Sequence, residues 1–209
     1  MAQGLGRPDR SGQGITRRGL AIGAGLALLA GPLAACGAGG DMATFDLTAT
    51  PEAIAPARRR GQLLILEPIA PAPLDSDRLI VRPTPDTVAT LKGAQWSDAL
   101  PRLVQTRLLR SFEDSHMLQA VARPGTGLEA THALSTEIRR FDIDVTAGEA
   151  VVEVSARLVS SGAGRIEAAR IFSARAPASA KDPTGAAMAL DASLARVSRD
   201  LIGWAAGKV

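Results

Sequence analysis

The fold is decided by residues 141–158, which read FDIDVTAGEAVVEVSARL. Apolar and polar side chains alternate on both sides of Ala147-Gly148, and this two-residue period is typical of strands with one buried face. Ala147-Gly148 and, further on, Gly162-Ala163-Gly164 are turn sequences. Residues 132–174 therefore predict an antiparallel meander.

The alternation changes phase before the first turn of this region. From Leu134 to Ile138 the apolar positions carry even numbers, whereas from Phe141 to Val145 they carry odd numbers. An extra residue must enter the strand between these two runs, so the sequence predicts a β-bulge near Arg139-Arg140.

Shorter apolar or alternating runs predict further strands upstream. They are Thr44–Thr48 at an edge, Leu63–Leu66, Arg78–Arg82, Thr87–Leu91 and Met117–Ala122. The run Leu63–Leu66 is wholly apolar, which is typical of a strand covered on both faces, and we expect it to be central. Residues 49–60 predict a loop, and its Arg58-Arg59-Arg60 run is interpreted as solvated, with contact to lipid headgroups or a partner as the alternative.

Two stretches change to a helical period of three and four residues. The first runs from Trp96 to about Glu113, with Ser97 or Asp98 as its cap and with Pro101 in the first turn, where a missing amide is tolerated. Its expected polar face comprises Asp98, Arg102, Gln105, Thr106 and Arg110. The second follows a Thr184 cap and includes Trp204; we expect it to pack on the sheet, with a coiled-coil partner as the alternative.

These elements predict an α+β fold in a single domain, with a mixed, largely antiparallel sheet, a long central helix and a C-terminal helix packed on the sheet. The composition agrees, since 209 residues at 46% hydrophobic and 22% charged are typical of one globular domain. With 3% aromatic residues and no tyrosine, few rings are present to stack on bases. One cysteine and two histidines exclude an internal disulfide and the common structural zinc sites, so we expect no metal and no cofactor.

The basic character of the chain is confined to its N-terminal part. The formal net charge is +3, but residues 1–35 hold four arginines and a single acid, Asp9, and the rest of the chain has as many acidic as basic residues. A neutral body exerts no net attraction on phosphates, so no nucleic-acid partner is expected.

Residues 1–35 are typical of an export signal. Arg17-Arg18 precede an apolar run of about a dozen residues, Gly19–Ala30, which is shorter than the roughly 20 residues that a spanning helix needs. An uncleaved membrane anchor is the alternative. The arginine pair leaves a twin-arginine export route open as well.

The sequence Leu33-Ala34-Ala35-Cys36 resembles the bacterial lipobox, in which a leucine and two small residues precede a lipidated cysteine. We therefore expect cleavage before Cys36, lipidation of its thiol and a flexible tether over residues 36–43. Two or three acyl chains suffice for stable membrane attachment. In Gram-negative lipoproteins an aspartate after the cysteine favours inner-membrane retention, so Gly37 implies the periplasmic face of the outer membrane.

Residues 44–209 resemble the ABC-type transport auxiliary lipoproteins. The resemblance rests on the lipobox, on Leu74–Arg82, on Leu91–Pro101 with its tryptophan, and on a C-terminal helix that ends near Trp204. It implies a periplasm-facing lipoprotein subunit of an intermembrane lipid transport system, with an MCE-type substrate-binding protein, an ABC permease and an ATPase as partners. Phosphate binding by the chain itself is not expected, because no Walker A sequence is present.

Catalysis is not expected. Asp114-Ser115-His116 places triad residue types side by side, but neighbours at a helix end point in different directions. Glu67, Asp75 and Asp77 flank prolines and are interpreted as loop residues. The alternatives are an envelope lipoprotein hydrolase, which needs His116 or His132 within about 3 Å of a serine or carboxylate, and a regulator of cell-wall synthases. Pairing of strand edges between copies leaves a homo-oligomer possible.

Overall fold

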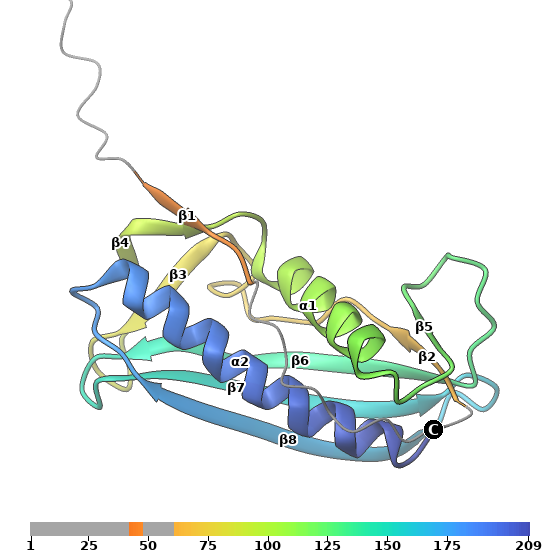
Figure 1. Ribbon diagram of the computed structural model, residues 1–209. Coiled ribbons are helices and arrows are strands. Elements are labelled where there is room, and N and C mark those ends of the chain that lie inside the picture. The colour runs from red at the N-terminus through yellow and green to blue at the C-terminus, as the bar shows by residue number, and fades with distance from the viewer. Residues whose placement is uncertain (1–41, 48–60) are drawn as a thin grey trace, which may run out of the picture. The chain divides into compact units, whose positions relative to one another are not determined.

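The computed structural model describes residues 42–47 and 61–209 of the chain (Figure 1). The predicted signal peptide, Cys36 and the 49–60 loop lie outside the described residues. Eight strands and two helices follow one another along this described part of the chain. They are β1 (Ala43–Phe45), β2 (Gln62–Ile65), β3 (Arg78–Arg82), β4 (Ala89–Trp96), α1 (Leu100–Ser115), β5 (Ala120–Ala122), β6 (His132–Asp144), β7 (Glu149–Ser160), β8 (Ile166–Pro177) and α2 (Pro183–Ala206).

All eight strands belong to one mixed sheet, which confirms the α+β prediction. Strand β6 organises it: β7 pairs with β6 antiparallel along almost its whole length, while β2 and β3 pair with β6 in parallel near its two ends. Strand β8 extends the sheet beyond β7, again antiparallel, as the predicted meander requires. The long pairings are antiparallel and the short ones, including those of β1 and β5, are mostly parallel.

The predicted bulge is present, because the β6–β7 register shifts between Ile138 and Arg140. Ile138 and Phe141 are both buried, on either side of the extra residue. The bulge therefore keeps the apolar positions of the two halves of β6 on the same face of the sheet.

The two helices cover one face of the sheet (Figure 1). Helix α2 lies against β7 and β8, where the ring of Trp204 meets that of Phe172 edge to face at 5.6 Å between centroids. This confirms the prediction that the C-terminal helix packs on the sheet. On the same face Trp96 meets Phe141 edge to face at 5.7 Å, and both residues are at most 2% exposed.

The start of α1 was placed too early by the sequence pattern. Strand β4 continues through Gly93, whose φ of +77° favours glycine, and ends at Trp96, so this tryptophan lies on a strand. The N-cap is Ala99, which offers no capping side chain; the carboxylate of Asp98 instead accepts the Ala99 amide and pairs with Arg102. Pro101 does lie in the first turn.

Three smaller differences concern the cap of α2, Gln105 and strand β2. Asp182, and not Thr184, caps α2, because its carboxylate accepts the Gly185 amide at 2.9 Å. Gln105 is buried instead of exposed on α1, and its Nε2 donates to the Ile65 carbonyl at 2.9 Å, which ties α1 to β2. Strand β2 is internal to the sheet as expected, but alternate residues are only half-buried, so one of its faces is incompletely covered.

Candidate functional site

Charged side chains concentrate on the face of β6, β7 and β8 that is turned away from the helices, which we name the outer face. Its positions alternate with the buried apolar positions of the same strands. Cross-strand ion pairs there join Arg139 to Glu153, Arg157 to Glu137 and Arg175 to Glu149, at 3.1 to 3.2 Å. Such partly exposed pairs each contribute little stability, but they order the face.

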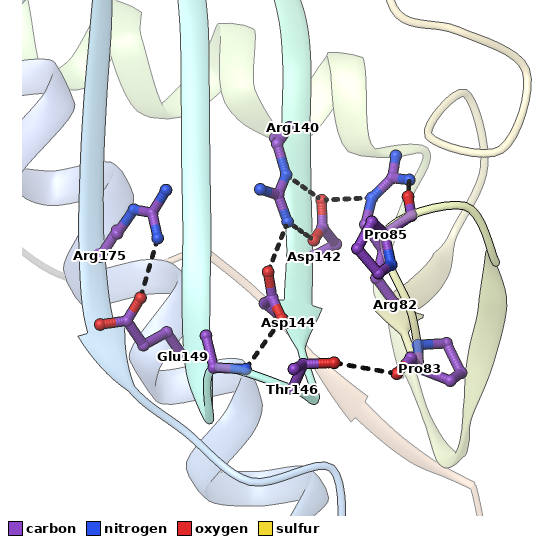
Figure 2. Close-up of polar contacts among 10 residues, drawn as sticks. Arg82, Pro83, Pro85, Arg140, Asp142, Asp144, Thr146, Glu149 and Arg175 are labelled. Atoms are coloured by element: carbon purple, nitrogen blue, oxygen red, sulfur yellow. Dashed lines mark hydrogen bonds and ion pairs between the residues drawn. The ribbon is translucent and has the colours of Figure 1, made fainter.

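The most buried group of this face is Asp142, whose side chain is 1% exposed (Figure 2). Arg140 donates to it twice, from Nη2 to Oδ1 at 2.6 Å and from Nε to Oδ2 at 3.2 Å. From β3, Arg82 brings its Nε to 3.3 Å from the same Oδ2. The parallel register sets these strands side by side, since Arg82 lies opposite Asp144 and Ile80 opposite Asp142.

The electrostatics of this cluster are balanced. The hydrogen bond to Asp142 raises the pKa of Arg140, and Asp144 supports it through a longer ion pair at 3.5 Å. The pKa of Asp144 is lowered, first by the Ala147 amide and then by Arg140. Two guanidinium groups thus meet two carboxylates, so the cluster joins β3 to the β6–β7 hairpin and carries no surplus charge for an anion.

A second charged side chain, Arg107 on α1, is 5% exposed and was not singled out by the sequence pattern. Burial lowers its pKa, opposed by the charges of Asp191 and Asp114. Within residues 42–47 and 61–209 its Nε and Nη2 have no hydrogen-bond partner. A helical period that treats arginine as polar predicts this position as exposed, so only the packed structure reveals its burial.

The adjacent triad types at the end of α1 do not assemble into a catalytic group. The Ser115 hydroxyl donates to the Phe112 carbonyl at 2.7 Å, within its own helix. His116 is exposed and has a left-handed φ of 50°, as the residue that ends α1. Ser115 and His116 therefore serve the helix terminus, and Asp114 is exposed beside them.

His132 has two polar neighbours, one on each ring nitrogen. Its Nε2 lies 3.0 Å from Oε2 of Glu167, and its Nδ1 lies 2.9 Å from Oγ1 of Thr131. The first distance is the one that the hydrolase alternative needs. The Thr131 hydroxyl also lies 3.4 Å from the Gln62 carbonyl, to which it donates. These contacts join β2, β6 and β8.

The remaining carboxylate candidates, Glu67, Asp75 and Asp77, are exposed. In the described part of the chain, no three His, Cys, Asp or Glu side chains gather closely enough to hold a metal ion. None of the helices in that part is both long and apolar enough to cross a membrane. The predicted lipidation site, Cys36, lies outside it and remains a prediction.

Comparison with known families shows to which family the chain belongs. The model of the family described as the ABC-type transport auxiliary lipoprotein component matches residues 45–202. The chain belongs to this family. The resemblance noted in the sequence is thereby confirmed, and membership in a family of lipoproteins that assist ABC transport implies association with the cell envelope.

Solved structures agree with this assignment. The auxiliary lipoprotein is similar to the crystal structure of protein XCC0632 from Xanthomonas campestris, with 31% identity, a TM-score of 0.71 and coverage of 79% of this chain and 97% of that one. An uncharacterized protein of known crystal structure, 12% identical, shares the fold with a TM-score of 0.65 over 79% of this chain and 99% of its own.

A relative in Bradyrhizobium diazoefficiens, the uncharacterized protein bll6063, is 36% identical over 172 residues. The match covers 80% of the auxiliary lipoprotein but 46% of the relative, so the chain spans about half the length of that protein.

Proposed function

We propose that this auxiliary lipoprotein is a periplasm-facing, non-enzymatic subunit of an ABC/MCE-type system that moves lipid between membranes. The observation that carries the proposal is the family match over residues 45–202, which spans every element from β2 to β8 and most of α2. An MCE-type substrate-binding protein, an ABC permease and an ATPase are the proposed partners. The described residues support a scaffolding role, because their charged clusters are internally paired and join strands.

The proposed attachment is through acyl chains on Cys36. The lipobox Leu33-Ala34-Ala35-Cys36 and the short tether to β1 support it, because a tether of about eight residues reaches roughly 15 Å. The domain then lies close to the periplasmic face of the outer membrane, where Gly37 directs it. A subunit held there is in place to contact a partner that bridges the two membranes.

Two measurements on one envelope extract test this proposal. The intact mass of the extracted chain is expected to show cleavage before Cys36 and added acyl groups, both absent from Cys36→Ser. Affinity purification in mild detergent is expected to enrich the MCE-type protein, the permease and the ATPase. An acylated chain that enriches none of these partners contradicts the transport role, whereas an unacylated, uncleaved chain contradicts the anchor.

A further inference from the structure

Strand β8 is a long edge of the sheet. Its twelve residues pair with β7, and no described strand pairs with its other side. Edge strands β1 and β5, in contrast, have three residues each. Figure 1 shows β8 along the lower border of the sheet, with α2 lying over β7 and β8.

Apolar side chains are exposed along this edge. Ile166 and Ile171 are 54% and 51% exposed, and Ala169 is exposed between them. A long edge with unpaired amides and exposed apolar side chains is a template for pairing with another strand.

Backbone groups at one end of the β8 edge are already bonded or missing, whereas those in the middle are not. At the C-terminal end, Nη1 of Arg196 on α2 donates to the Arg175 carbonyl at 2.9 Å, and Pro177 has no amide to offer. In the middle, the guanidinium of Arg170 lies 5.0 Å from the centre of the Phe172 ring on its own strand. The segment from Ala168 to Ala174, centred on Ile171, has no comparable cap among the described residues.

We propose that this segment pairs antiparallel with β8 of a second copy of the chain, around a two-fold axis that passes through Ile171. In that register each residue lies opposite the residue equally far on the other side of Ile171. Arg170 of one copy then lies opposite Phe172 of the other, and Ala168 opposite Ala174. Ile171 of one copy meets Ile171 of the other at the axis.

The charges of β8 select this register and a second copy as the occupant. A shift that brought Arg170 opposite itself would set like charges side by side, which is unfavourable. Around Ile171 each Arg170 instead lies opposite the Phe172 ring of the other copy, the kind of ring that it already contacts on its own strand, so the segment is complementary to itself. Because Ile171 lies opposite itself, the same faces of the two sheets become continuous. Helix α2 of both copies therefore lies on the same side of the extended sheet.

The association is expected to be weak in dilute solution, because a single pair of edges buries less area than a standard stable interface. Anchoring of both copies in one membrane, which rests on the proposed function, raises their effective concentration and favours the pair. The pairing itself does not depend on the transport role, so cross-linking in membranes can detect it independently of transport.

Cross-linking through Ile171→Cys tests the geometry in the full-length chain in its own membranes. Directly opposed residues of antiparallel strands lie about 4.5 to 5.5 Å apart at Cα, within the range that a disulfide bridges. Mild oxidation is expected to yield a homodimer. Two matched controls, the unsubstituted chain and Met188→Cys on the exposed side of α2, are expected to yield none. An Ile171→Cys chain that stays monomeric, cross-links no better than the Met188→Cys chain or cross-links to a different protein overturns the proposal.

Like charge at the axis gives an independent test. Ile171→Lys sets two ammonium groups opposite each other and is expected to weaken self-association in detergent by about tenfold or more, measured by sedimentation. Ile171→Thr, which suits a strand and adds no charge, is the control and is expected to retain association. Because Ile171 is half-exposed, both variants should fold, and their melting temperatures check this. Equal self-association of the Lys and Thr variants, or none in the unsubstituted chain at any concentration, overturns the pairing.

Discussion

Arg140 holds the buried carboxylate of Asp142 by two hydrogen bonds, at 2.6 and 3.2 Å, two residues further along the same strand. Arg140 is also the residue at which β6 resumes its register after the bulge. The bulge and the ion pair therefore meet at one point of the outer face. Arg82 extends the contact to β3, so a local irregularity of one strand is used to join distant parts of the chain.

Replacing Asp142 is expected to destabilise the fold more than replacing any exposed partner on the outer face. Asp142→Asn removes the negative charge that two partly buried guanidinium groups face, and we expect a loss of about 2 to 4 kcal/mol in the free energy of unfolding. Glu153→Gln, which removes a partly exposed pair with Arg139, is the control and should cost under about 1 kcal/mol. Urea titration of both variants checks this; equal losses would contradict a locking role for Asp142.

The buried contact between α1 and β2 gives a second prediction. Gln105→Met keeps the volume of the side chain but leaves the Ile65 carbonyl without its Nε2 donor, and we expect a loss of about 1 to 2 kcal/mol. Arg110→Met, at an exposed position of the same helix, should change stability by less than about 0.5 kcal/mol. If Gln105→Met is as neutral as the control in thermal and urea unfolding, the hydrogen bond contributes nothing.

The edge-to-face pair of Trp96 and Phe141 lends itself to a double-mutant cycle. Each single change to leucine is expected to cost about 1.5 to 3 kcal/mol, because it leaves a cavity in the core. The two changes together should cost less than their sum, by about 0.5 to 1.5 kcal/mol, since the rings interact beyond their burial. Strict additivity in the cycle would show that the ring geometry is incidental.

The ion pair ahead of α1 predicts a local pH dependence. The hydrogen bond from Arg102, and then the Ala99 amide, lower the pKa of Asp98 to about 2 from its ordinary 3.8. Since the pKa is lowered by folding, the contribution of Asp98 is present above about pH 4 and is lost as the pH falls toward 2. An NMR titration of the Asp98 carboxylate should therefore have its midpoint near 2, and the midpoint should rise toward the ordinary value in Arg102→Gln, in which the Ala99 amide still lowers it. A midpoint unchanged by Arg102→Gln would rule the pair out as the cause.

Sequence pattern was informative wherever the physical cause is local. The meander follows from strict alternation and glycine turns, and the bulge follows from a change of parity between Ile138 and Phe141. The boundary at Trp96 was misplaced because Lys92-Gly93 interrupts the alternation of β4, so its last residues match a helical period equally well.

Contacts between segments that are distant in the sequence could not be predicted from the sequence pattern. Arg82 and Asp142 are sixty positions apart, and their meeting depends on the parallel β3–β6 register, which no local pattern specifies. Gln105 was placed on the polar face because an amide is polar, although a buried carbonyl on β2 makes its burial favourable. His132 and Glu167 similarly meet only because β7 lies between their strands.

Lipid traffic between the two membranes of the living cell is the most direct measure of the proposed role. Transfer of labelled phospholipid is to be compared in cells that lack this chain, in cells that carry only Cys36→Ser, and in cells that lack the ATPase of the same system. We expect all three to slow transfer to a similar extent. Transfer at the normal rate without this chain, in cells where loss of the ATPase slows it, would contradict the account.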